Sequence, residues 1–150
     1  MIIQAGFDLE FLARLLIAPE GEILPRLVLI ELDAEMQFAD IGVASCQFDG
    51  SLEPHFDTIL EHLDPDTTRY FAIAHAGGWE CTDSVHARVL AEADALRDMA
   101  LARGFLMIGH FGLDEDGYLS NGPHYYFDRY HLGLPCTMDH WVHSKHGKCG

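Results

Sequence analysis

The sequence predicts a single α/β domain in which a mixed β-sheet is sandwiched between helices. Two observations predict this class: short apolar runs suited to buried strands, and longer segments with apolar residues at helical spacing that alternate with those runs. At 150 residues the chain can bury one ordinary hydrophobic core. The composition shifts toward His, Tyr and Gly near the end, so we expect a domain at 1–122 and an irregular C-terminal extension at 123–150.

The first predicted elements are a helix and two strands. Residues 8–17 predict a helix, with Asp8 as its N-cap and Pro19 as its stop. Residues 27–32 predict a buried strand, and residues 38–48 a second strand paired with it. The residues expected on the buried side of the helix are Leu9, Leu12, Leu15 and Leu16.

Two further helices are predicted at 55–63 and 85–103. The first ends at Asp64-Pro65-Asp66, and the second is the longest helix of the chain. Their expected buried residues are Phe56, Ile59, Leu60 and Leu63 in the first, and Val85, Val89, Ala93, Leu96 and Ala100 in the second. Between and after them, residues 70–74 and 105–108 predict buried strands, and a hairpin turn follows at 114–118.

The segment 70–86 joins a strand end, a Gly-Gly turn, a loop and a helix start. The strand delivers His75 to the turn, the loop contains Trp79 and Cys81, and the helix starts near Ser84. Backbone N–H groups and side chains converge where such elements meet, so this segment is the candidate site of the chain.

The order of these elements resembles the RadC branch of the JAB (MPN) family. The stretches that carry the resemblance are Leu27-Val-Leu-Ile-Glu-Leu-Asp33, Phe48-Asp-Gly-Ser-Leu52, the helix at 55–63 with the strand ending Ala74-His75, Gly104-Phe-Leu-Met-Ile-Gly-His110, and Asp114-Glu-Asp-Gly-Tyr-Leu-Ser120. The resemblance covers residues 27–122. It implies a cytidine-deaminase-like α-β-α sandwich with a mixed sheet.

The resemblance also implies a zinc site, and this chain departs from its pattern. Active members hold zinc with a His-x-His pair and the Asp of a Ser-x-x-Asp helix start, and a Glu on an earlier strand acts through the metal-bound water. Here the first His corresponds to His75, but the second falls on Gly77. Ser84 matches the Ser, which places Ala87 at the Asp position, and the strand before Phe48 offers Ser45 and Cys46 where the Glu is expected. One His cannot hold a three-ligand catalytic zinc, so we expect a degenerate, non-hydrolytic cleft formed by His75 and Ser84.

Other ligand sets for zinc remain open. His75, Cys81 and His86 form a candidate Cys-His-His site, because the loop and the helix start face the same strand end. The extension offers a second set of zinc-preferred ligands, Cys136, His140, His143, His146 and Cys149. The alternatives are a hydrogen-bonded core histidine at position 75 and solvated histidines in the extension.

Several residues have two interpretations. His110 either joins the site or serves the structure, and Trp79 either anchors a partner or covers the sheet. Cys81 and His86 would also suit a nucleophilic pair, but the sequence offers no recognisable third member. Cys46 is expected to be a small buried residue.

Acidic residues dominate the first half of the chain. Residues 1–68 contain 14 acidic residues and two arginines, a formal charge of −12, whereas residues 69–150 contain 10 acidic and seven basic residues, giving −3. Such a field disfavours nucleic acid and favours a protein partner with a basic surface, although a solvated surface has the same composition. The candidate contacts flank the second strand and are expected at one edge of the sheet: Asp33, Glu35, Asp40, Asp49, Glu53 and Asp57, with Trp79 as a further candidate.

The sequence shows no secretory signal and no apolar run of membrane-spanning length, and its four scattered cysteines suit a reducing compartment. We therefore expect a cytoplasmic protein. Three functions are consistent with these features. The first, which we favour, is a degenerate JAB domain that binds a protein through its former cleft and acidic face. The second is a zinc-dependent hydrolase with rearranged ligands. The third is an acidic inhibitor that blocks a nucleic-acid-binding protein, as in mobile-element or phage counter-defence systems, and it is compatible with the first.

Overall fold

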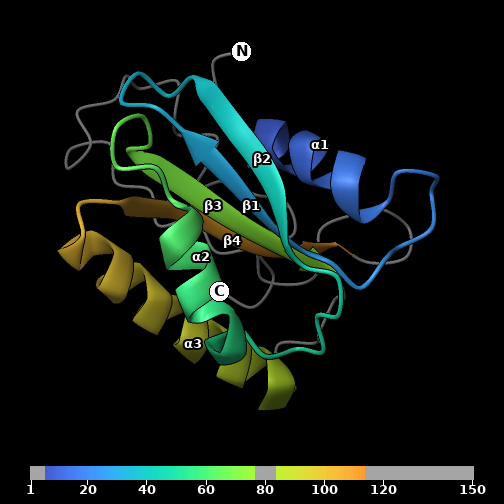
Figure 1. The fold of residues 1–150 in the computed structure, drawn as a ribbon. Coiled ribbons are helices and arrows are strands. Elements are labelled where there is room, and N and C mark those ends of the chain that lie inside the picture. The colour runs from blue at the N-terminus through green and yellow to red at the C-terminus, as the bar shows by residue number, and fades with distance from the viewer. Residues whose placement is uncertain (1–5, 77–83, 114–150) are drawn as a thin grey trace.

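Helices and strands alternate along the chain in the predicted order. The computed structural model of the protein describes residues 6–76 and 84–113. Within these ranges the elements are α1 (Gly6–Ile17), β1 (Leu27–Leu32), β2 (Phe38–Ser45), the short 3-10 helix η1 (Glu53–His55), α2 (Phe56–His62), β3 (Tyr70–Ala76), α3 (Ser84–Ala102) and β4 (Leu106–Leu113) (Figure 1).

The four strands form one mixed sheet with the order β2-β1-β3-β4. β1 lies antiparallel to both β2 and β3, and β3 lies parallel to β4. A short turn is enough to join β1 and β2, whereas the parallel pair needs a longer crossover, in which α3 lies. Among the described strands, β2 is therefore an edge, and β1 and β3 are interior. The predicted mixed α/β architecture is confirmed.

Helices cover both faces of the sheet, which gives three layers (Figure 1). On one face, called the α1 face, α1 packs with alternate residues of the interior strands, among them Ile30, Ala72 and Ala74. On the other, called the α2–α3 face, both later helices pack with intervening residues such as Phe71 and Ile73. Side chains alternate along a strand, so β3 presents Ala72 and Ala74, after Tyr70 at its start, to the α1 face and the larger Phe71 and Ile73 to α2 and α3. Two separate apolar clusters thus hold the sheet.

A β-bulge in β4 changes the direction in which the end of that strand faces. Positions 71 and 72 of β3 pair with Met107 and Gly109, which leaves Ile108 as an extra residue in β4. In a regular strand His110 would face the side opposite to Met107. The extra residue instead brings His110 to the α2–α3 face, beside its pairing partner Ile73.

The turn between β1 and β2 is held by Asp33. Its Oδ1 accepts the backbone N–H groups of Glu35 and Gln37, each at 2.9 Å. Met36 has a φ of 62°, in the left-handed region, and its side chain is buried in the cluster on the α1 face. Burial of this side chain and the Asp33 hydrogen bonds offset the cost of a left-handed residue other than glycine.

The predicted buried side of α1 is wrong at one position. Leu15 is 53% exposed, whereas Ala13 and Ile17 are buried. Leu15 follows Leu9 by six residues, which rotates it about 240° around an α-helix and away from the sheet. The helix also begins at Gly6, so Asp8 lies in its first turn instead of at the N-cap.

The predicted buried residues of the other two helices are confirmed where they are described. Those that are buried are Ile59, Leu60, Leu63, Val89, Ala93, Leu96 and Ala100, and Phe56 is partly buried. The side chain of Val85 lies outside the described part of the chain.

Two strands have other bounds than the sequence predicts. β2 ends at Ser45, because the Ser45 hydroxyl accepts the backbone N–H two residues later at 3.1 Å and the chain turns. Phe48 then enters the core, and Cys46, in the bend, is exposed where burial was predicted. β4 runs from Leu106 to Leu113 where a strand at 105–108 was predicted, so His110 lies inside the strand and not just beyond it.

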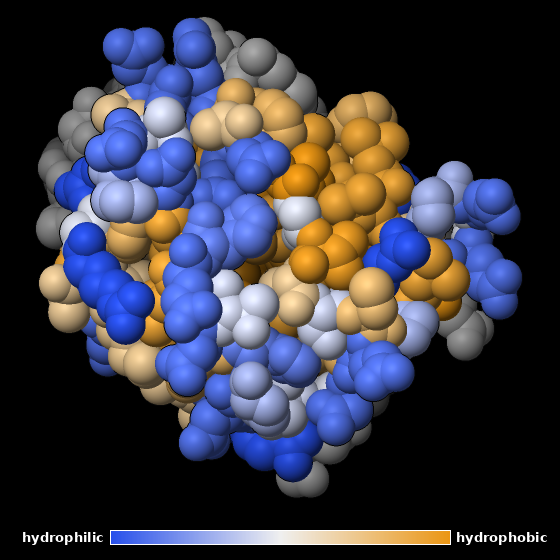
Figure 2. Space-filling view, in the orientation of Figure 1, coloured by the Kyte–Doolittle hydropathy of each residue, from blue (hydrophilic) through white to orange (hydrophobic). Residues whose placement is uncertain are grey.

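The surface over α1 is apolar (Figure 2). Phe11 and Leu15 of this helix are each more than half exposed, and Val43 of β2 is exposed on the same face of the sheet. None of the helices in the described ranges is both long enough and apolar enough to cross a membrane.

Candidate functional site

His75, at the end of β3, is buried among aromatic rings. It is 1% exposed, and its ring stacks on that of Phe48 with the centroids 4.6 Å apart. Its Nε2 lies 2.8 Å from Nε2 of His110, which the bulge in β4 has turned to the same face. The ring of His55 also approaches Phe48, at 6.4 Å between centroids. We call these four residues the ring cluster.

Hydrogen bonding determines which nitrogen of His75 carries hydrogen. Its Nδ1 lies 3.1 Å from the carbonyl oxygen of Ala76. A carbonyl oxygen only accepts, so Nδ1–H is the donor. In the neutral ring Nε2 then offers a lone pair, to which Nε2–H of His110 donates. An imidazole oriented by a backbone carbonyl in this way is also the form in which histidine binds a metal.

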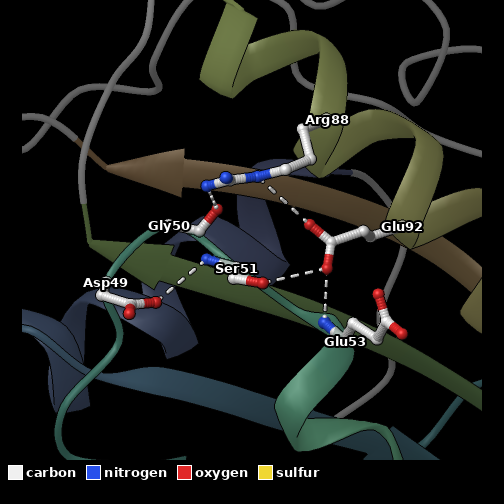
Figure 3. A network of polar contacts seen from close by, with 6 residues as sticks. All are labelled: Asp49, Gly50, Ser51, Glu53, Arg88 and Glu92. Atoms are coloured by element: carbon white, nitrogen blue, oxygen red, sulfur yellow. Dashed lines mark hydrogen bonds and ion pairs between the residues drawn. The ribbon is translucent and has the colours of Figure 1, made fainter.

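The loop at 48–53, which places Phe48 on His75, is tied to α3 by Glu92. Its Oε2 accepts the hydroxyl of Ser51 at 3.1 Å and the backbone N–H of Glu53 at 2.6 Å (Figure 3). Glu53 is the first residue of η1, so the Glu92 carboxylate also accepts a backbone N–H at the start of a helical segment.

Arg88, one turn before Glu92, contacts the same loop. It forms an ion pair with Glu92 at 3.6 Å and donates to the carbonyl oxygen of Gly50 at 3.1 Å. Within the loop, Asp49 Oδ1 accepts the backbone N–H two residues later at 3.3 Å. Together these contacts hold the loop against α3 (Figure 3). Phe48, at the start of this loop, stacks on His75 at the end of β3.

The structure describes only part of the predicted cleft. Outside the described residues lie Trp79 and Cys81 and the whole predicted set of the extension, Cys136, His140, His143, His146 and Cys149. Ser84 is the first residue of α3 and His86 follows in its first turn, but their side chains are outside the described part. Of the histidines predicted near this site, the structure brings together His75 and His110.

A second polar cluster lies on the α2–α3 face near the start of β3. Glu31, in the apolar β1, is 2% exposed. Its Oε1 accepts the hydroxyl of Thr68 at 2.7 Å and the backbone N–H of Asp64 at 3.3 Å. Its Oε2 lies 3.1 Å from Nδ1 of His62, the last residue of α2. Asp40, which pairs with Glu31 across the hairpin, has a carboxylate oxygen within 4.8 Å of ligand atoms of both Glu31 and His62.

The six predicted acidic contacts lie along the β1–β2 hairpin and the segment after it. Asp33 and Glu35 lie in the hairpin turn, Asp40 lies on β2, Asp49 and Glu53 follow that strand, and Asp57 lies in the first turn of α2. Asp33 is partly exposed, and the other five are exposed. Two of the six, Asp33 and Asp49, also have a structural role, because their carboxylates accept backbone N–H groups within turns.

Sequence reasoning missed the Glu31 cluster, although the sequence contains a signal for it. Glu31 interrupts an otherwise apolar run from Leu27 to Leu32 that predicts a buried strand. A carboxylate in such a strand needs hydrogen-bond or ionic partners, because burial without them is costly. Its hydrogen-bond partners lie more than 30 residues away in sequence, so only the fold shows that they meet.

Comparison with known proteins adds no relative. No protein-family model matches the chain, and neither a curated protein nor a solved structure shows significant similarity to it. The resemblance to the JAB family therefore stays a prediction.

The arrangement of the ring cluster predicts a specific tautomer. At a pH where the rings are neutral, His75 should carry hydrogen on Nδ1, and long-range ¹H–¹⁵N correlation of the imidazoles measures this directly. In a His110→Phe variant the Nδ1–H of His75 should persist, because Ala76 holds it, while the Nε2 resonance shifts as its donor is lost. A neutral His75 with hydrogen on Nε2 would contradict the arrangement.

Proposed function

We propose that this chain is a degenerate RadC-like JAB domain that binds a basic protein partner through its former cleft and through the acidic surface formed by the six predicted contacts. The succession of elements supports the family assignment: α1, the β1–β2 hairpin, α2, β3, α3 and β4 form an α-β-α sandwich with a mixed sheet. His75 lies at the end of β3, where the resemblance expects the first histidine of its motif.

The packing at the end of β3 supports a non-hydrolytic role. A catalytic zinc needs ligand nitrogens that face an open, water-accessible position. Here the ring of His75 is buried, Phe48 stacks on one side of it, and its Nε2 is within hydrogen-bond distance of His110. The loop at 48–53 is in turn anchored to α3 by Glu92 and Arg88. These contacts suit a packed structural element better than a metal-bound water.

The observation that carries the binding proposal is the negative charge along the β1–β2 hairpin and the segment after it, at the six predicted contacts. In the described ranges, none of the six predicted contacts forms an ion pair with a lysine or arginine. Exposed carboxylates that no lysine or arginine of the described residues pairs with give a negative field that attracts a basic surface and repels nucleic acid. β2, which is partly exposed, is also an edge of the sheet that the described strands form, and a partner could hydrogen-bond to its backbone groups.

Charge reversal at three of these residues tests the proposal. Glu35→Lys, Glu53→Lys and Asp57→Lys, combined, should lower the association rate with a basic partner captured from cell extract by about 10-fold or more, because electrostatic steering is lost. Asp33 and Asp49 are left unchanged because their carboxylates hold turns. Association and dissociation rates are measured by surface plasmon resonance at low and physiological salt.

The matched control carries the same change of net charge elsewhere. Glu20→Lys, Glu22→Lys and Asp98→Lys alter exposed residues that are not among the six predicted contacts and should leave most of the association rate intact. Equal loss in both triple variants would mean that net charge, not this surface, attracts the partner. Tight binding of the wild type to DNA at physiological salt would contradict the proposal outright.

One observation favours a second candidate, a zinc-dependent hydrolase with rearranged ligands. The Nε2 atoms of His75 and His110 converge from neighbouring strands, and the Ala76 carbonyl fixes the His75 tautomer that a metal requires. Cys81 or His86 would have to supply a further ligand. Each Nε2 already faces the other at hydrogen-bond distance, however, so the first function accounts for the geometry without a metal.

We expect no zinc-dependent peptidase or isopeptidase activity from the wild type. The assay follows cleavage of fluorogenic peptide and isopeptide substrates by protein reconstituted with zinc, alongside a His75→Ala variant and a Cys46→Ala control at an exposed residue. Hydrolysis that needs zinc, persists in Cys46→Ala and disappears in His75→Ala would replace the first function with the second.

A further inference from the structure

We propose that Glu31, Asp40 and His62 form a binding site for a divalent metal ion of the zinc type. One ligand atom from each lies within 4.8 Å of the other two. The three residues come from β1, β2 and the end of α2, so the fold and not local sequence brings them together. The proposed partner binding does not require a metal here, although Asp40 belongs both to this site and to the six acidic contacts.

Hydrogen bonds hold the carboxylate of Glu31 in a fixed orientation, as is usual for the ligands of a metal ion. Its Oε1 is held by two neutral donors outside the cluster, the Thr68 hydroxyl at 2.7 Å and the Asp64 backbone N–H at 3.3 Å. With Oε1 held in this way, Oε2 faces Nδ1 of His62 at 3.1 Å, and a carboxylate oxygen of Glu31 lies within 4.8 Å of one of Asp40. Groups that hold a first ligand in this way raise metal affinity, because the ligand loses little freedom on binding.

The charge of the cluster also calls for a cation. Two carboxylates approach each other here, one of them buried, and burial makes an uncompensated charge costly. Among the described residues, the ion-pair partner of Glu31 is His62, whose side chain is 47% exposed and carries a charge only when protonated. A divalent ion would neutralise both carboxylates at once.

The donor set defines the class of metal. One imidazole with two carboxylates suits zinc and similar transition metals better than calcium or magnesium, which prefer oxygen ligands alone. Three protein ligands leave a position for water or for a group from another molecule. A bound ion would connect the edge strand β2 to β1 and to the end of α2, and so would stiffen the acidic hairpin.

The site is distinct from the ring cluster. Glu31 pairs with Phe71 of β3, whereas the ring cluster contains His75. Four residues of a strand separate these positions by about 13 Å. A metal at one place therefore uses none of the ligands of the other.

Zinc titration of the full-length protein by calorimetry, after removal of metal with a chelator, tests the proposal. The wild type should bind one equivalent of zinc at this site. Asp40→Asn and His62→Gln should each lower the affinity for this zinc by about 10–100-fold or more, because loss of a group that only supports a ligand already lowers metal affinity by about that factor. Thr68→Val, which removes the hydroxyl on Glu31 and keeps the side-chain shape, should weaken it by about 10–100-fold. Glu61→Gln makes the same charge change as Asp40→Asn on a neighbouring exposed residue and should have no effect.

A second readout separates this equivalent from zinc bound elsewhere. His62 now carries hydrogen on Nδ1, because that atom faces a carboxylate. When zinc binds Nδ1 of His62, the hydrogen moves to Nε2, and imidazole ¹⁵N spectra report this change. A His75→Ala variant should still show the change and should still bind this equivalent of zinc. The proposal is overturned by absence of zinc binding at millimolar free metal, by binding that Asp40→Asn and His62→Gln do not weaken, or by equal weakening in Glu61→Gln.

Discussion

Burial of β3 on both faces of the sheet is the constraint on which the rest of the structure depends. Its residues alternate between the cluster under α1 and the cluster under α2 and α3, and it pairs with β1 on one side and β4 on the other. Small residues at 72 and 74 face α1, while Phe71 and Ile73 fill the opposite side. Because side chains alternate with a period of two, a shift of one residue would exchange the two faces along the whole strand.

This alternation of side chains also places both clusters of polar side chains on the same face of the sheet. Glu31 and His75 both face α2 and α3, as their pairing with Phe71 and Leu27 shows. The bulge at Ile108 adds His110 to the same face, and the loop at 48–53, anchored by Glu92, adds Phe48. Two polar clusters consequently share one layer of the sandwich at opposite ends of β3, one closed by aromatic rings and one open to solvent through His62 and Asp40.

Periodicity was enough to predict the order and type of the helices and strands, because strong apolar patterns set them. It failed where the outcome depends on three-dimensional geometry. Leu15 has the right residue type but the wrong rotation around α1, and Cys46 lies in a bend that the Ser45 hydroxyl makes. The contact of His110 with His75 needs a bulge that no sequence period shows, and the partners of Glu31 come from distant segments. The acidic surface, by contrast, could be predicted from composition, since exposure is the ordinary state of acidic residues.

Native-state hydrogen exchange along the sheet tests the central claim most directly. If burial of β3 on both faces holds the structure, amides of residues 70–75 should exchange only through global unfolding, with opening free energies equal to the stability of the whole domain. Amides of β2, which lies at an edge of the sheet that the described strands form and is only partly buried, should exchange through smaller local openings. Exchange of the β3 amides as fast as those of β2 would contradict the account.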